Sequence, residues 1–511
     1  MSLTTDSVAR LIPSSPFETL ADYLSVSHGG EGLRAARLVD REVVIGELEA
    51  SGLRGRGGAG FPTGTKWRTV VSYESAALAT SVVVNAAEGE PGTFKDRTIL
   101  LANPYAVLEG ALIAARVVGA RTVTIATKQR FDEVVARVRS AIEEIRGAGW
   151  LQDPTVGEIE MTVVEGPAEY LYGEETALLE VLDGRPPFPR IAPPWRRGVV
   201  EVVADGRVDS GSGLPADVDL AVAADDNLAP PVLVDNVETL ANVAGITALG
   251  ATWFRSLGTE ESPGTIVCTV TGAVRRPGVI EVPMGTPLRA VLERAMTEVD
   301  EVADSVDEAP PIRCVLMGVS NAVLAFDELD LPISYEAMRS HGSGLGSASF
   351  IVVEDSTHPA AVAAGVSRFL AVESCGQCTP CKQDGLQISG LLDSMVAGTA
   401  EPTDLATIAK RLDTIVVGAR CSLATQHQTV VRSIFDAFPD AMRTQAEVNA
   451  PPVAPYLVAE LIGIDDGTTT VDESFVHRQP DWTFAERDSG QMPAERLDDH
   501  RQPLAVDTHD N

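Results

Sequence analysis

Four cysteines constrain the fold of this chain more than any other feature of its sequence. Cys375, Cys378 and Cys381 stand at C-x2-C-x2-C spacing, and Cys421 follows 40 residues after the last of them. Such a triplet brings three sulfurs to one side of a turn, and one remote sulfur can complete a four-thiolate site. We therefore expect the fold to bring the segment around residue 421 against the triplet.

The three-plus-one arrangement favours an iron–sulfur cluster over the alternatives. Structural zinc sites usually pair two C-x2-C units, giving two plus two ligands, whereas three plus one suits a [4Fe–4S] cube better. Zinc, or no metal at all, are the alternatives. A disulfide framework is not expected in so long a chain with six cysteines. Cys268 and Cys314 lie in apolar, strand-like runs, and we expect them to be buried as small hydrophobic side chains.

Length and charge limit the class of protein. A chain of 511 residues exceeds one ordinary core and predicts about three domains. No apolar run approaches the length of a membrane span, and the N-terminus lacks the pattern of a secretory signal. With thiols reserved for metal, the cytoplasm is the expected compartment. The net charge of −33 argues against nucleic acid and mainly favours solubility, with a basic partner as a second interpretation.

A glycine-rich segment is basic within this acidic chain. Residues 55–64 hold five glycines, and Arg54, Arg56 and Lys66 lie close by. Glycines let the backbone approach a ligand and direct N–H groups at phosphate, and a lysine adds a point charge. The segment matches neither common phosphate-binding loop motif. It indicates a site for an anionic ligand, with a flexible surface loop as the alternative.

The next segments predict a sheet with ligand-binding groups at its edge. Ser81–Val84 is a short β-branched run typical of a buried strand, and Asn85, Glu88 and Glu90 follow it directly. Ligands gather at the carboxyl ends of parallel strands, where such side chains can bond sugar hydroxyls or ring edges. A plain polar loop is the alternative. Strand–helix alternation then predicts a parallel or mixed sheet covered by helices: helix 104–118, strand 122–127, helix 129–147 and strand 160–166.

The remaining pattern divides into further segments. Glu174 and Glu175 open a predicted helix, where they either favour the helix dipole or hold groups of a ligand. The later segments are predicted as follows: 185–230 irregular, 231–243 a strand running into a helix, 264–282 two β runs, 287–298 a helix, 299–311 an exposed acidic loop, 340–347 a glycine hinge, and 358–440 helical. The tail 441–511 carries 14 acidic residues and five arginines. We expect it to be mostly disordered, with residues 456–464 docking on the body.

Seven motifs, taken in order, resemble one family. They are GLRGRGGAGFPTGTKW, NAAEGEPGTFKDR, YGEETALLE, NVETLANV, RRPGVIEVPMGTPL, GSGLGS and ESCGQCTPC with Cys421, and they span residues 52 to about 435. Together they resemble the NADH-binding flavoprotein subunit of respiratory complex I and the related diaphorase subunits of NAD-linked hydrogenases and formate dehydrogenases. Several motifs in family order are far more specific than any single one.

This resemblance implies an α/β fold class: a Rossmann-like FMN/NADH domain, then a small β-grasp module and a C-terminal helical bundle carrying a [4Fe–4S] cluster. The implied boundaries are 1–245 for the FMN- and NADH-binding domain with its helical lead-in, 246–338 for the β-grasp (soluble ligand-binding-like) module, 339–440 for the helical iron–sulfur domain, and 441–511 for the acidic tail.

The resemblance also assigns roles to single residues. Those expected at FMN are Gly55, Gly57, Lys66, Asn85, Tyr170, Glu174 and Asn236. Those expected at NADH are Phe61, Glu90, Glu175 and Trp195. The cluster ligands are Cys375, Cys378, Cys381 and Cys421. No side chain is expected to be catalytic, because hydride transfer belongs to FMN.

The chain departs from the family pattern at several positions. Ala87 stands where an Asp is typical, and Asp235 replaces an Asn and adds a negative charge near the expected flavin. Tyr172 stands where Cys is common, and Thr69 where an aromatic residue is expected.

The function implied is NADH dehydrogenation. NADH delivers two electrons as a hydride and a cluster takes one at a time, so a flavin is needed between them. The expected electron acceptor is a thioredoxin-like [2Fe–2S] subunit or a ferredoxin, within a larger dehydrogenase complex that would hold the protein at the inner face of the membrane. The alternatives are an NAD(P)H–ferredoxin reductase outside a respiratory complex, a flavin-less iron–sulfur scaffold, and a zinc protein with an unrelated small-molecule site.

Overall fold

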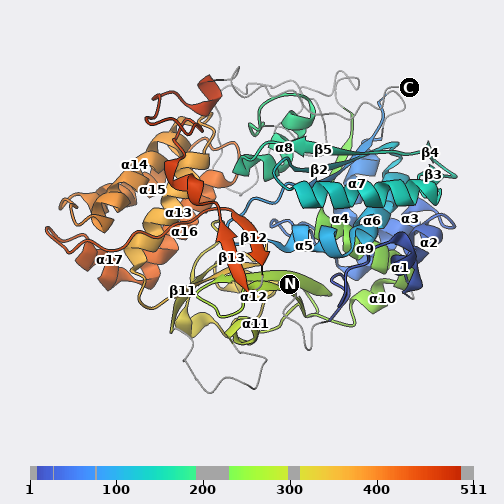
Figure 1. Cartoon of the computed structure of the whole chain (residues 1–511), viewed down its shortest axis with the longest axis horizontal. Coiled ribbons are helices and arrows are strands. Elements are labelled where there is room, and N and C mark those ends of the chain that lie inside the picture. Colours follow the sequence, from blue (N-terminus) through green and yellow to red (C-terminus); the bar gives the residue numbers. More distant parts are fainter. Residues whose placement is uncertain are drawn as a thin grey trace.

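The computed structural model describes residues 8–26, 28–74, 78–191, 230–296, 311–465 and 467–496. Figure 1 shows an α/β part on one side, a second sheet below it, and a group of helices on the other side. The predicted NADH residue Trp195, most of the segment 185–230 that was predicted to be irregular, and most of the predicted acidic loop lie outside the described residues. Within them no single helix has the length and apolarity to cross a membrane, although the bent pair of helices Lys95–Ala102 and Pro104–Val118 passes on length and composition.

The first sheet is parallel, as predicted, with strand order β5-β2-β1-β6. Its strands are β1 (Ser81–Ala86), β2 (Thr122–Lys128), β5 (Glu160–Gly166) and β6 (Val232–Asn236). The valines of β1 are fully buried because helices cover both faces of the sheet. The register pairs Asn85 on β1 with Asn236 on β6, so two of the predicted FMN residues end neighbouring strands.

Helices pack on both faces of this sheet. Before β1 come α1 (Leu20–Ser25), α2 (Glu31–Ala36), α3 (Arg41–Ser51) and α4 (Thr63–Ser72). Within and after the sheet come α5 (Lys95–Ala102), α6 (Pro104–Val118), α7 (Asp132–Gly147), a 3₁₀ turn η1 (Tyr170–Gly173), α8 (Glu175–Leu182), α9 (Val237–Leu249) and α10 (Ala251–Phe254). A small hairpin joins β3 (Gln152–Asp153) to β4 (Gly157–Glu158). Helix α6 has the predicted bounds because Asn103 caps its start and Gly119, with φ +72°, ends it.

The second sheet has strand order β10-β9-β11-β7-β8. Its elements are β7 (Thr265–Gly272), β8 (Gly278–Pro283), α11 (Leu288–Met296), β9 (Ile312–Leu316), β10 (Leu324–Ala325), η3 (Phe326–Glu328), α12 (Tyr335–Ser340) and β11 (Ser349–Glu354). Strands β7 and β8 form the predicted antiparallel pair. Cys268 and Cys314 are buried, as expected of small hydrophobic side chains.

A helical bundle follows the second sheet. It consists of α13 (Pro359–Glu373), α14 (Thr379–Val396), α15 (Asp404–Thr414), α16 (Leu423–Ala437) and α17 (Pro439–Gln445). Cys375 and Cys378 lie between α13 and α14, Cys381 lies in the first turn of α14, and Cys421 lies just before α16. The bundle thus has the predicted position along the chain.

The structure corrects the prediction of a mostly disordered tail for residues 441–496. This segment contains the hairpin of β12 (Leu461–Asp465) and β13 (Thr468–Val471), followed by η4 (Glu473–His477) and η5 (Pro493–Glu495). Composition misled the prediction because a few large apolar side chains suffice to dock the tail: Phe475 and Trp482 are buried in the core of the bundle. Val458 and Leu461 are buried too, so residues 456–464 dock as expected. Residues 497–511 lie outside the described chain.

Candidate functional site

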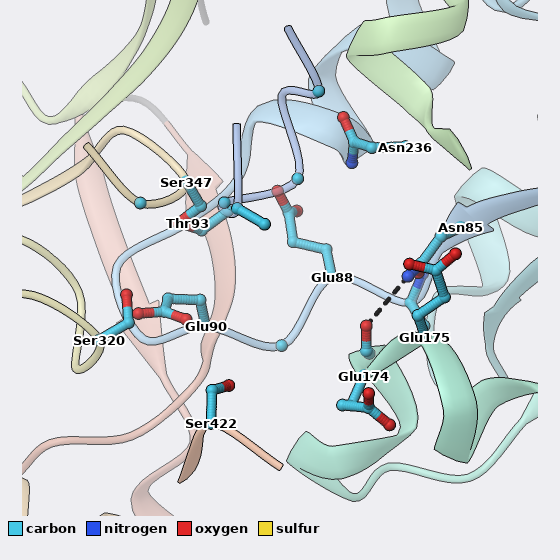
Figure 2. A pocket seen from close by; sticks show the side chains of 18 of the residues that line it. Asn85, Glu88, Glu90, Thr93, Glu174, Glu175, Asn236, Ser320, Ser347 and Ser422 are labelled. Carbon is cyan, nitrogen blue, oxygen red and sulfur yellow. Dashed lines mark hydrogen bonds between the residues drawn. The ribbon is translucent and has the colours of Figure 1, made fainter. Parts of the chain in front are cut away.

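A cavity of about 560 Å³ opens where the three parts of the protein meet. Its walls come from the glycine-rich loop, the ends of β1 and β6, the start of α8, and loops of the second sheet and the bundle. Figure 2 shows carboxylate, amide and hydroxyl side chains around this space. Ligand pockets usually measure roughly 300–1,000 Å³, so the cavity is large enough for a cofactor. Every predicted FMN or NADH residue among those described lines it: Gly55, Gly57, Phe61, Lys66, Asn85, Glu90, Tyr170, Glu174, Glu175 and Asn236.

The glycine-rich loop has a fixed conformation, which argues against the flexible-loop alternative. Gly60 has φ +63°, and a Cβ there would lie 2.5 Å from the ring of Tyr335. Arg56 is buried and donates to the carbonyl oxygens of Pro263 and Thr265 at 3.2 and 3.1 Å. These contacts tie the loop to the second sheet and leave its backbone facing the cavity.

Lys66 brings a positive charge from α4 to the cavity. Its Nζ donates to Glu175 Oε1 at 2.9 Å and to the carbonyl oxygen of Val234 at 2.5 Å. Burial lowers the pKa of this ammonium group, but attraction from Glu175 and Asp235 outweighs burial, so the pKa lies above its ordinary value. Lys66 is therefore a permanent cation at the floor of the cavity and suits a phosphate group.

The negative charge added by Asp235 is compensated in part. Its Oδ2 accepts a hydrogen bond of 2.7 Å from the indole of Trp67, and its Oδ1 lies 3.9 Å from Lys66 Nζ. Burial nevertheless raises the pKa of Asp235 to about 6, because Lys66 and Trp67 offset only part of the desolvation.

Three predicted FMN residues also hold the backbone around the cavity. Asn85 donates from Nδ2 to the carbonyl oxygen of Gly173 at 2.9 Å, which Figure 2 shows. Glu174 caps α8 by accepting the backbone N–H groups of the following turn at 2.8 and 3.0 Å. Asn236 caps α9 and donates from Nδ2 to Asp96 at 2.6 Å. These residues predicted to bind FMN therefore also stabilise the backbone around the cavity.

Of the predicted NADH residues, Glu90 contacts a loop of the second sheet and Phe61 is exposed, whereas Glu175 pairs with Lys66. Glu90 accepts from the Tyr170 hydroxyl and from the backbone N–H of Val319, each at 2.9 Å. Burial raises the pKa of Glu90. Phe61 is 52% exposed, although it lines the cavity, so its ring is free to stack on a planar ligand.

Sequence reasoning missed several residues at this cavity. Lys95 is buried against Asp96 at 2.6 Å and Glu238 at 3.0 Å and adds a second cation. The hydroxyl of Thr93 lies 2.9 Å from that of Ser347. Further lining residues arrive from the second sheet and the bundle: Ser320, Asn321, Ser422, Thr425 and Gln426. Lys95 and Thr93 lie in the motif NAAEGEPGTFKDR and Ser347 lies in GSGLGS, so these three had a usable signal, whereas the remaining lining residues follow no local pattern.

The four predicted cluster ligands surround a second, smaller cavity. Cys375, Cys378, Cys381 and Cys421 all line it. Three residues line both cavities: Leu171, Cys421 and Leu423. Across the described residues no three His, Cys, Asp or Glu side chains are spaced to hold a single metal ion.

The environment of these thiols fits a bound cationic centre. Burial raises the pKa of the Cys381 thiol to about 11 and raises that of Cys421 well above its ordinary value. The amide of Gln377 lies 3.5 Å from the Cys375 sulfur, and the Ser374 hydroxyl lies 3.4 Å from that of Cys381. Burial disfavours the negative charge of a thiolate, and a bound iron–sulfur cluster supplies the positive charge that compensates it. Buried thiolates with such donors are therefore typical of iron–sulfur ligation.

Family models match each of the three parts. The Nuo51 FMN-binding domain matches residues 48–245, the SLBB domain matches 267–295, and the NADH-ubiquinone oxidoreductase-F iron-sulfur binding region matches 361–445. These matches identify the larger cavity with an FMN-binding domain and the smaller one with a [4Fe–4S] region.

Curated and solved proteins agree with these matches. The F subunit of NADH-quinone oxidoreductase in Mycobacterium tuberculosis is 32% identical over 86% of this chain and 92% of its own length. The F 2 subunit of the same enzyme in Rhizobium meliloti is 35% identical over 75% of this chain and 84% of its own. A chain of an NAD+-reducing [NiFe]-hydrogenase in the H2-reduced state is 29% identical with a TM-score of 0.69, covering 84% of this chain and 67% of that chain. This chain therefore belongs to the family of the F subunits of NADH-quinone oxidoreductase.

Proposed function

We propose that this protein oxidises NADH with bound FMN and passes the electrons singly through a [4Fe–4S] cluster to a partner. One observation carries the proposal: the cavity with the predicted FMN residues and the cavity with the four cysteines share Leu171, Cys421 and Leu423 as walls. Two redox groups bound in these cavities would be separated by about the thickness of one side chain. FMN supplies the chemistry, since it accepts a hydride and releases single electrons.

The chain's own groups bind and orient FMN. The backbone at Gly55 and Gly57 allows close approach, because a Cβ at Gly57 would lie 3.2 Å from Asn236. Lys66 provides the charge for an anionic group. The predicted residues Asn85, Tyr170, Glu174 and Asn236 offer hydrogen-bond groups around the remaining wall. A flavin-less scaffold does not suit an open cavity walled by these residues.

NADH is held from the other side. Phe61 gives an exposed aromatic face, and Glu90 and Glu175 provide carboxylate oxygens for hydroxyl groups. Trp195 is proposed for the same site from its sequence motif, outside the described residues. No side chain of the protein needs to exchange a proton with the nicotinamide, so positioning is the protein's contribution.

The partner is proposed to be a thioredoxin-like [2Fe–2S] subunit or ferredoxin. The relatives carry the names of subunits of NADH-quinone oxidoreductase, which supports a role within a larger complex. We further propose that the protein works in the cytoplasm. A larger complex would hold it at the inner face of the membrane. Isolation of a stable multi-subunit complex from native extract would exclude a lone ferredoxin reductase.

Cofactor analysis tests the proposal directly. The full chain is purified anaerobically, and its FMN and iron are counted per chain. NADH is then added while flavin absorbance and ferricyanide reduction are followed. We expect bound flavin that bleaches with NADH, together with steady NADH oxidation. An iron-replete preparation that keeps no FMN and oxidises no NADH would reject the proposed function.

A further inference from the structure

The C-terminal strap, defined here as residues 456–496, joins the bundle to the α/β part beyond the residues that the iron–sulfur model matches. Glu460 forms ion pairs with Lys128 at 2.6 Å and with Arg130, both from the end of β2. The guanidinium of Arg97 donates to the carbonyl oxygen of Leu461 at 2.7 Å. Figure 1 shows the β12–β13 hairpin between the helical bundle and the α/β part.

The strap then crosses the cysteine turn. Trp482 donates from its indole to the carbonyl oxygen of Val372 at 2.9 Å, and the backbone N–H of Ala494 donates to the carbonyl oxygen of Cys375 at 2.9 Å. The ammonium of Lys382, on α14, donates to the carbonyl oxygen of Pro480 at 2.6 Å. The strap therefore contacts the backbone before and within the cysteine triplet and the side chain of the residue that follows it.

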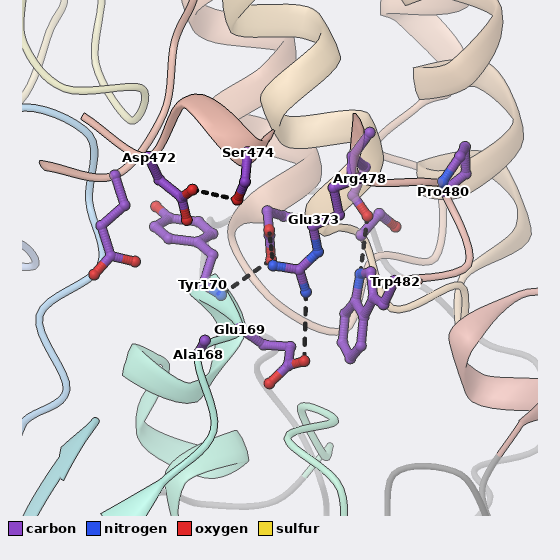
Figure 3. Close-up of polar contacts among 12 residues, drawn as sticks. Ala168, Glu169, Tyr170, Glu373, Asp472, Ser474, Arg478, Pro480 and Trp482 are labelled. Carbon is purple, nitrogen blue, oxygen red and sulfur yellow. Dashed lines mark hydrogen bonds and ion pairs between the residues drawn. The ribbon is translucent and has the colours of Figure 1, made fainter. Parts of the chain in front are cut away.

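Arg478 occupies the centre of this arrangement, as Figure 3 shows. Its Nη1 lies 3.0 Å from Glu373 Oε1, and its Nη2 lies 3.4 Å from Glu169 Oε1. The other oxygen of Glu373 accepts the backbone N–H of Tyr170 at 3.0 Å. Arg478 is thus linked to Tyr170, the first residue of η1, through the carboxylate of Glu373. It also pairs directly with Glu169, the residue before η1.

The turn η1 forms part of the wall between the two cavities, together with Cys421 and Leu423 of the bundle. Tyr170 and Leu171 line the larger cavity, Leu171 also lines the smaller one, and the Tyr170 hydroxyl bonds to Glu90. Glu373 is 2% exposed. A carboxylate buried this deeply is held in place by its counter-charge, and loss of one partner of such a pair is strongly unfavourable. The position of η1 therefore depends on the pair between Arg478 and Glu373.

We infer that Arg478 is a positioning residue for electron transfer: acting through Glu373, it holds the turn Tyr170–Gly173 between the flavin and cluster cavities. This inference rests on the proposed function for its redox consequence. The strap is then part of the electron-transfer machinery, although none of its residues lines either cavity among those described.

Three variants of the full chain test this inference: Arg478→Gln, Arg478→Lys and, as a matched control, Arg130→Gln. The control removes two ion pairs at the hairpin, to Glu460 and Asp472, and neither of them contacts Glu373. Amide hydrogen exchange is measured in cofactor-free protein, so a failure to bind FMN or the cluster would reject the proposed function without deciding this inference.

Arg478→Gln should accelerate amide exchange across residues 169–174 by about tenfold or more, the factor that corresponds to losing a hydrogen bond to a charged group. Arg478→Lys keeps the charge but cannot reach both carboxylates, so its exchange should fall between those of the wild type and Arg478→Gln. Arg130→Gln should accelerate exchange in residues 460–472 and leave residues 169–174 within about twofold.

The loaded protein supplies a second readout that general loss of structure would not produce. In Arg478→Gln, reduction of the cluster, followed by freeze-quench electron paramagnetic resonance, should slow by a larger factor than the bleaching of the flavin by NADH. Unchanged exchange at residues 169–174, or equal effects of Arg130→Gln and Arg478→Gln on both readouts, would overturn the inference. If Arg478→Gln does not accumulate, Arg478→Lys decides: exchange at residues 169–174 faster than in the control supports it, and exchange no faster overturns it.

Discussion

Asp235→Asn should stabilise the folded protein at alkaline pH. The carboxylate is 6% exposed, and burial raises its pKa from an ordinary 3.8 to about 6 in spite of Lys66. A group whose pKa rises on folding contributes stability below its unfolded pKa and loses it as the pH rises through the folded pKa. An asparagine keeps an oxygen for the indole of Trp67 and carries no charge, so it avoids this loss.

The size of the effect follows from the shift in the pKa of Asp235. About two units correspond to about 3 kcal/mol in the free energy of unfolding above pH 7, at 1.36 kcal/mol per unit. The advantage of the asparagine should fall to about half that near pH 5, where Asp235 is mostly protonated in the folded protein and mostly ionised in the unfolded chain. It should vanish near pH 3.

Urea unfolding of the cofactor-free protein at pH 8 and pH 5 measures this difference. The control is Asp413→Asn, because the Asp413 side chain is 70% exposed and its variant should change stability by less than about 0.5 kcal/mol at either pH. A gain for Asp235→Asn that is absent at pH 8, or that does not shrink at pH 5, would refute the argument that desolvation of Asp235 opposes folding.

Three further substitutions test the site and the strap. Gly60→Ala places a Cβ 2.5 Å from the Tyr335 ring at φ +63°, so we expect FMN affinity to fall by about 5- to 150-fold in a fluorescence titration, for a strain of about 1–3 kcal/mol. Gly46→Ala, which meets nothing within 4 Å, should leave the affinity unchanged. Cys421→Ser should lose iron by metal analysis while FMN stays bound, and full iron content would contradict the ligand assignment. Glu460→Gln removes the partner of a fully buried lysine on β2, so proteolysis in the β12–β13 hairpin should accelerate, in line with a cost of about 3–5 kcal/mol, and unchanged cleavage would contradict docking by this ion pair.

Local patterns in the sequence were sufficient to predict the parallel sheet. The β-branched run before Asn85 and the Asp235-Asn236 junction each predict a strand followed by polar groups. The structure places these two strands side by side in matching register, so that Asn85 and Asn236 meet. Strand order followed no local signal, because it depends on which helix packs on which face.

Residues that reach the cavity from other parts of the chain could not be predicted in this way. Ser320 follows β9 in the second sheet, and Ser422 immediately precedes α16 in the bundle. Ser320 has no neighbouring motif, and Cys421 beside Ser422 points to the cluster and not to this cavity, since both positions depend on how whole domains pack. The tail shows the same limit: its composition indicates disorder, whereas Trp482 and Arg478 find buried partners only in the assembled fold.

The contact between the two cavities is itself a product of domain packing. Leu171 belongs to a turn after the first sheet, whereas Cys421 and Leu423 belong to the bundle, more than two hundred residues later. Either domain could fold correctly and still leave the cavities too far apart if the bundle docked differently. Because electron transfer between bound groups requires a short separation, the interface that fixes this docking is as necessary as the ligands. The ion pairs of the strap lie at this interface, and the strap is therefore the part of the chain where a substitution can impair electron transfer without touching a cofactor.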